Sequence, residues 1–155
     1  MRLNLADAAA VRQAAEALIG LGEALLVERM VGDAVAELIV GIGRDPQIGL
    51  HLVLGSGGTL VELVGDTRIL LLPAGRAEIA AAIGALKVAT LIAGHRGRPK
   101  GDLDAAVDAV LAIQDFALAR ADRLAELDVN PLIIQPSGAV AADVLLRLVE
   151  ETDVR

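Results

Sequence analysis

Apolar residues recur along the chain at two spacings, one typical of strands and one typical of helices. Runs rich in Val, Ile and Leu, bounded by Gly, Pro and Asp, predict strands, and they cover residues 24–30, 35–43, 51–54, 60–64, 68–72, 124–134 and 140–148. Apolar residues at helical spacing predict helices over residues 8–18, 76–86 and 103–120. We therefore expect an α+β (α/β) fold in which helices pack on a mostly antiparallel sheet.

Capping and turn residues mark the ends of these elements. Asp7 and Asp102 each precede a helical run, and each predicts an N-cap. Gly65-Asp66 predicts a hairpin turn between the strands at 60–64 and 68–72. The run Gln135-Pro136-Ser137-Gly138 predicts the turn that joins the last two strands.

The stretch E-L-D-V-N-P, from Glu126 to Pro131, alternates polar with apolar residues. Residues two apart on a strand share a face, so we expect Glu126, Asp128 and Asn130 to point the same way. Counting outward from the last turn pairs Asn130 with Asp143 on the following strand. An amide oxygen and a carboxylate side by side are ligands that Mg²⁺ takes together with phosphate oxygens. The alternative interpretation is a solvent-facing strand with ordinary polar residues, which is the commoner source of such alternation.

Composition indicates a globular protein and excludes several classes of site. Apolar residues make up 55% of the 155 residues and charged residues 23%, which predicts a single domain over residues 1–155. The net charge of −7 disfavours a nucleic-acid partner, and the absence of cysteine excludes disulfides and thiolate metal sites. No signal peptide and no apolar run of membrane-spanning length is visible, so we expect a cytoplasmic protein without membrane contact.

Positive charge is concentrated at Arg44 and in the loop at residues 94–101. The loop reads G-H-R-G-R-P-K-G and carries the basic residues His95, Arg96, Arg98 and Lys100. These side chains have the chemistry of a phosphate or carboxylate clamp. A solvated loop is the other interpretation, and the cluster judged alone favours it.

A G-S-G-G run at Gly55 to Gly58 follows the third predicted strand. Consecutive glycines let backbone N–H groups approach a phosphate closely, but they also make ordinary strand bends. The run lacks the Lys-Ser/Thr of a P-loop. His51 lies within an apolar strand, and we expect it to be structural.

Four blocks of the sequence, in order and with their spacing, resemble the NDP-forming acyl-CoA synthetases. This family includes ADP-forming acetate–CoA ligase and is related to the succinyl-CoA synthetase β-chain. The blocks are A-E-L-I-V-G-I-G-R-D-P-Q-I-G, G-S-G-G-T-L-V-E-L-V-G-D, G-H-R-G-R-P and A-E-L-D-V-N-P-L-I-I-Q-P-S-G-A-V-A-A-D. The R-D-P-Q run and the short spacing from N-P to the aspartate favour this branch over another ATP-grasp ligase, such as a succinyl-CoA synthetase β-chain relative.

The resemblance covers residues 1–148 and implies the C-terminal lobe of an ATP-grasp domain. By position it implies that Asn130 and Asp143 hold the Mg²⁺ of ATP or ADP. It implies that a further set of positions borders the nucleotide or contacts an anion: Glu37, Arg44, Gly55, Gly57, Gly58 and Arg96. The family reaction converts acyl-CoA, NDP and phosphate into carboxylate, CoA and NTP through an acyl phosphate and a phosphohistidine. Such catalysis depends mainly on positioning phosphates and neutralising their charge.

The chain departs from the family in extent and at particular positions. It begins at a point inside the family's ATP-grasp domain, so the other lobe and the domains that bind CoA and carry the phosphohistidine are implied partners. Glu28 and Arg29 stand where relatives carry a Gln-Glu pair near the adenine, and Leu145 stands where relatives often carry a basic residue. Two hypotheses stay open: a nucleotide-binding lobe that is inactive alone, or a diverged, non-catalytic subunit or interaction module. An apolar face left without its partner also predicts self-association.

Overall fold

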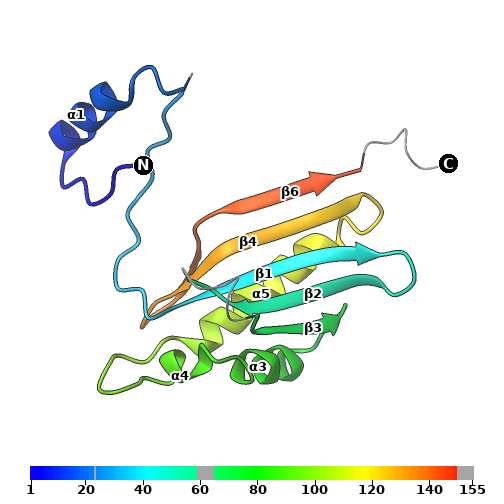
Figure 1. Cartoon of the computed structure of the whole chain (residues 1–155). Helices are drawn as coiled ribbons and strands as arrows, with labels where there is room; N and C mark the ends of the chain where they lie inside the picture. Colours follow the sequence, from blue (N-terminus) through cyan, green and yellow to red (C-terminus); the bar gives the residue numbers. More distant parts are fainter. Residues whose placement is uncertain (23, 59–64, 150–155) are drawn as a thin grey trace. The chain divides into compact units, whose positions relative to one another are not determined.

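The computed structural model describes residues 1–22, 24–58 and 65–149 (Figure 1). The chain divides into two compact units, Met1–Gly32 and Asp33–Arg155, and each is described by itself. Among the described residues, none of the helices is both long and apolar enough to cross a bilayer.

The first unit contains one described helix, α1 (Ala8–Leu18). The Asp7 side chain accepts hydrogen bonds from the backbone N–H groups of Ala9 and Ala10, at 2.9 and 2.8 Å, which confirms the predicted N-cap. The strand predicted over 24–30 is wrong, because the described residues there form no ladder. An extended run becomes a strand only when its backbone pairs with a neighbour, and the described part of this unit holds no other strand.

The second unit is built on one antiparallel sheet. Its strands are β1 (Ala36–Asp45), β2 (Gly49–Ser56), β3 (Thr67–Leu71), β4 (Leu124–Ile134), β5 (Ala139–Ala141) and β6 (Val144–Leu148). The order across the sheet is β3-β2-β1-β4-β5, and β6 also pairs with β4. Every pairing is antiparallel, which confirms the expected fold class.

Helices α3 (Arg76–Gly84) and α5 (Leu103–Leu118) lie together on one face of this sheet (Figure 1). Alternate residues of the central strands point to the helices, and this side carries the core. Its largest fully buried side chains include Leu38, Val40, Ile42, Leu52, Leu54, Ile79, Ile83, Val107, Val110, Leu124, Leu132 and Ile134. The short helix α4 (Ala89–Ile92) was not predicted, because four residues are too few to show a helical period.

The last strand of the sequence prediction, 140–148, is interrupted in the structure. Residues 139–141 and 144–148 form separate strands, and both pair with β4. The strand predicted over 68–72 is β3, which pairs with β2. Its predicted hairpin partner over 60–64 lies outside the described residues.

Gln114 is the buried polar residue of the described core. Its side chain accepts a hydrogen bond from the Ala74 N–H at 2.7 Å and donates one to the Ala74 carbonyl at 3.2 Å. Gln114→Ala should lower the free energy of unfolding by about 2 kcal/mol, because both backbone groups would be left buried without partners. Urea unfolding measures this loss, and Gln47→Ala, at an exposed turn, is the matched control. Equal losses in the two variants would contradict the assignment.

Candidate nucleotide and metal site

The acidic residues of β4 lie on the sheet face that points away from α3 and α5. Asp128 pairs with Gly41 and Glu126 pairs with Gly43, both on β1. A Cβ atom placed on Gly41 would lie 3.5 Å from the Asp128 Oδ1 atom, so this carboxylate reaches across the space that glycine leaves open. Leu127, between the two acids, is buried on the opposite side. The shared face predicted for Glu126 and Asp128 is therefore confirmed.

A bulge in β4 ends this alternation at Asn130 and Pro131. Val129 pairs with Val40, whereas Leu132 pairs with Leu38, so β4 has one more residue than β1 in this interval. In a regular strand Leu132 would share a face with Asp128, because the two are four residues apart. The extra residue instead turns Leu132 towards the helices, where it is buried. The acidic face thus ends at Asn130.

The structure brings Asn130 and Asp143 together. The Asn130 N–H donates to the Asp143 carbonyl at 3.1 Å, and the Ala142 N–H donates to the Pro131 carbonyl at 3.0 Å. Both Asn130 and Asp143 are exposed. The pairing obtained by counting outward from the turn is confirmed, and the role of the two residues as metal ligands stays a prediction.

Negative charge accumulates around Asp128. Burial raises the pKa of the Asp128 carboxyl, and the charges of Glu126 and Asp143 raise it further. Arg147 lies 3.4 Å from a Glu126 carboxylate oxygen, and both side chains are well exposed, so this ion pair is weak. A cation bound on this face would relieve the repulsion between the carboxylates.

The donor atoms fit Mg²⁺ bound together with a nucleotide. Among the described residues, no group of three or more His, Asp or Glu side chains is placed to hold a metal by itself. Mg²⁺ does not need such a cage, because it commonly keeps several waters and takes one or two carboxylates plus phosphate oxygens. Asp143 would supply a carboxylate oxygen and Asn130 an amide oxygen.

Asp128→Asn should stabilise the folded protein by about 0.5 kcal/mol at pH 7, a small value because solvent screens the neighbouring charges. A carboxyl whose pKa is raised by folding disfavours the folded state when it is ionised. This penalty is present above the folded-state pKa and is lost below the unfolded value of about 3.9. Urea unfolding at pH 7 and pH 4 should therefore show the gain shrinking in acid. Asp115→Asn on α5 is the control. If Asp128→Asn were less stable than this control at pH 7, the account would be contradicted.

The G-S-G-G run joins the end of β2 to Glu37. The Gly57 N–H donates to the Glu37 carbonyl at 2.7 Å, and a Cβ atom on Gly57 would lie 2.8 Å from the Glu37 backbone. Gly55 is buried within β2, opposite Ile39. Gly58 has a φ of +104°, and among the described residues no atom lies within 4 Å of the position that a Cβ atom would take there. Glu37 and Gly57 are thus in direct contact, and Gly58 makes no such close approach to the described residues.

Arg44 lies at the opposite end of β1 from Glu37, about 23 Å away along the strand. Its Nε atom donates to the Leu124 carbonyl at 3.1 Å. The structure therefore does not bring these two predicted residues together.

Arg96 stands at the tip of the basic loop, with a φ of +50° beside Gly97 at +78°. The Arg98 N–H donates to the His95 carbonyl at 3.1 Å and closes this turn. Among the described residues, no hydrogen bond or ion pair links Arg96 to Asn130 or Asp143.

His51 projects from β2 over Gly43, where a Cβ atom would lie 3.1 Å from the ring. Its Nδ1 atom is buried and has no hydrogen-bond partner among the described residues. Its expected structural role is not tested.

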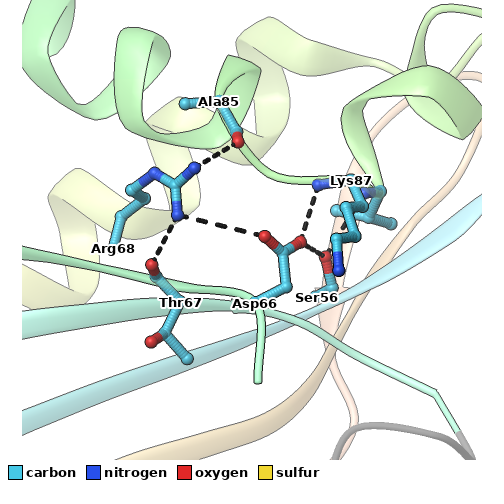
Figure 2. A network of polar contacts seen from close by, with 7 residues as sticks. Ser56, Asp66, Thr67, Arg68, Ala85 and Lys87 are labelled. Atoms are coloured by element: carbon cyan, nitrogen blue, oxygen red, sulfur yellow. Dashed lines mark hydrogen bonds and ion pairs between the residues drawn. The ribbon is translucent and has the colours of Figure 1, made fainter. Parts of the chain in front are cut away.

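The sequence prediction missed the polar network around the Asp66 side chain (Figure 2). Its Oδ2 atom accepts from the Ser56 hydroxyl at 2.5 Å and from the Lys87 N–H at 2.6 Å. The Ser56 hydroxyl bond is the largest cause of a lowered Asp66 pKa. Ser56, Asp66 and Lys87 come from three separate segments, so no local motif could have revealed them.

Asp128 was also left out of the predicted ligands, although its position two residues before Asn130 is a usable signal.

Comparisons with known proteins show which family this chain belongs to. A family model described as the ATP-grasp domain matches residues 1–148. ADP-forming acetate–CoA ligase I of Archaeoglobus fulgidus is 36% identical over 129 residues, which is 83% of this chain and 18% of that protein. The β subunit of ADP-forming acetate–CoA ligase II of Pyrococcus furiosus is 30% identical over 113 residues, or 73% of this chain and 48% of that subunit.

A solved structure is similar over nearly the whole chain. It is the dinucleotide-forming acetyl-coenzyme A synthetase 1 of Ca. Korarchaeum cryptofilum, in complex with coenzyme A and Mg-AMPPCP. The TM-score is 0.84 at 31% identity, and the match covers 95% of this chain and 67% of that one. The chain spans less than half of the two curated relatives, 18% and 48% of their lengths. The chain belongs to the ATP-grasp domain family, in the group that contains the ADP-forming acetate–CoA ligases.

Proposed function

We propose that this chain is the Mg²⁺- and nucleotide-binding C-terminal ATP-grasp lobe of an NDP-forming acyl-CoA synthetase. The whole enzyme would interconvert acyl-CoA, NDP and phosphate with carboxylate, CoA and NTP. The observation that carries the proposal is the pairing of Asn130 with Asp143 beside the Asp128 carboxylate, on the face free of α3 and α5. Family membership supports it, because similar structures hold Mg-AMPPCP or Ca-AMPCP.

Within this proposal, the residues have separate tasks. Asp143 and Asn130 hold the metal, whose charge would neutralise phosphate oxygens during transfer. Asp128 maintains the negative potential that attracts a cation to this face. Glu37 and Gly58 border the nucleotide on β1 and after β2. Domains or subunits beyond this lobe would bind CoA and carry the phosphorylated histidine, in the cytoplasm.

Calorimetric titration of Mg²⁺–ADP and Mg²⁺–ATP into the chain tests the proposal. We expect binding in the presence of Mg²⁺ and none in excess EDTA, because the phosphates approach an acidic face only through the cation. If the chain alone gives no heat, the titration is repeated with the remaining ATP-grasp lobe of a relative supplied in trans. Absence of metal-dependent binding in both formats would contradict the proposal.

The second candidate function is a diverged, non-catalytic subunit or interaction module. Leu145 favours it, because this exposed apolar residue lies opposite Asp128 on the same face. Under this alternative the chain associates with a partner, or with itself, without needing Mg²⁺ or nucleotide. Sedimentation that shows association unchanged by EDTA, together with no nucleotide binding in either titration, would favour it.

A further inference from the structure

We infer that Asp66, acting through Ser56, is a positioning residue that fixes Gly57 and Glu37 at the edge of the nucleotide face. The inference rests on the proposed function for its effect on nucleotide affinity. It also has a structural readout that does not depend on nucleotide.

Asp66 is a nearly buried carboxylate, with a side chain 5% exposed. A buried carboxylate is tolerated only when charged or hydrogen-bonding partners compensate for lost hydration. Asp66 has three: the Ser56 hydroxyl, the Lys87 N–H, and Arg68 at 3.9 Å. Figure 2 shows these groups converging on the carboxylate, and Arg68 is itself held by the Ala85 carbonyl. The carboxylate therefore connects β2, the start of β3 and the segment between α3 and α4.

Ser56 carries this constraint to the glycine run. Its hydroxyl donates to Asp66 and accepts from the Val88 N–H at 3.3 Å, while its own N–H donates to the Asp66 carbonyl at 3.1 Å. Both the side chain and the backbone of Ser56 are thus fixed. The next residue is Gly57, whose N–H holds the Glu37 carbonyl.

The connection from Asp66 to Glu37 is continuous. Asp66 holds Ser56, Ser56 is covalently joined to Gly57, and Gly57 lies against the Glu37 backbone at a distance that only glycine permits. Loss of the Asp66–Ser56 side-chain bond would leave the end of β2 held by backbone hydrogen bonds alone and would loosen the contact between Gly57 and β1. Glu37 is also paired with Ile133 on β4, and the contact with Gly57 fixes it from the β2 side.

The experiment compares Asp66→Ala and Ser56→Ala with Ser56→Thr, which keeps a hydroxyl, and with Asp45→Ala. Asp45 is the matched control because its carboxylate also accepts two hydrogen bonds, from the N–H groups of Gln47 and Ile48, at the other end of the β1–β2 pair. Amide hydrogen exchange of Gly57 is followed by NMR. The Kd for Mg²⁺–ADP and the melting temperature are measured on the same samples.

We expect Asp66→Ala and Ser56→Ala to accelerate Gly57 exchange and to raise the Kd by about tenfold each. Ser56→Thr should retain the wild-type exchange rate and Kd. Asp45→Ala should lower the melting temperature without either effect, because it removes the acceptor of two backbone hydrogen bonds far from Gly57. This control separates positioning from general destabilisation. If Asp66→Ala does not fold, Ser56→Ala decides, because it removes only one oxygen atom.

Unchanged Gly57 exchange in Asp66→Ala and Ser56→Ala would overturn the inference. The inference would also be overturned if, across all four variants, the increase in Kd simply tracked the decrease in melting temperature. If the wild type shows no metal-dependent nucleotide binding, the proposed function fails, and the exchange of Gly57 alone then decides the structural inference.

Discussion

Asp143→Ala and Asn130→Ala should each weaken Mg²⁺–ADP binding by at least about 100-fold. Loss of a group that only supports a metal ligand commonly costs 10- to 100-fold in affinity, and loss of a ligand should cost no less. The backbone of Asn130 is hydrogen-bonded to that of Asp143, in the segment between β5 and β6, so both residues are held at neighbouring positions. Calorimetric titration at constant Mg²⁺ measures the change.

Two controls make this result interpretable. Asp115→Asn removes one negative charge from α5, on the other side of the sheet, and should leave the Kd unchanged. The melting temperatures of Asn130→Ala and Asp143→Ala should stay close to that of the wild type. Both residues are exposed, and surface substitutions cost little stability. A Kd within twofold of the wild type in either ligand variant would refute the assignment of that residue.

Gly57→Ala should lower the free energy of unfolding by about 3 kcal/mol. The added Cβ atom would lie 2.8 Å from the backbone carbon, the carbonyl oxygen and the Cβ atom of Glu37, and these atoms cannot yield as a flexible side chain can. Relief of the clash would also break the hydrogen bond from Gly57 to Glu37. Urea unfolding measures the loss.

Gly58→Ala is the matched control for Gly57→Ala. Gly58 has a φ of +104°, so alanine there is strained, but none of the described residues has an atom within 4 Å of the added Cβ atom. We expect a loss of about 1 kcal/mol from backbone strain alone. Equal losses at the two positions would show that the contact with Glu37 does not determine the requirement for glycine at residue 57.

Local patterns were sufficient to predict much of the second unit. Alternation of Leu38, Val40 and Ile42 follows directly from one sheet face packing on helices, and the helix capped by Asp102 begins where predicted. The pairing of Asn130 with Asp143 was also predictable, because a short turn at 135–138 fixes the register of the strands that it joins. These features depend on residues close together in the sequence.

Features that depend on distant residues were not predictable. The bulge in β4 exists because Leu132 must reach the core while Asp128 does not, a requirement set jointly by β1 and the helices. The strand expected over 24–30 failed because its apolar residues predict extension but not a pairing partner. Of the predicted site residues, Glu37 and Gly57 meet, whereas Arg44 lies at the far end of β1, since sequence order says nothing about which end of a strand faces a ligand.

The bulge at Asn130 and Pro131 sets a condition for protein engineering. In a regular strand, the sequence E-L-D-V-N-P-L would place residues 126, 128, 130 and 132 on one face, which would expose Leu132 or bury the two acids. The irregular pairing reconciles an acidic half and an apolar half within one strand. A designer who moved this face to another sheet would therefore have to transfer residues 126–132 as a unit, opposite a partner strand shorter by one residue.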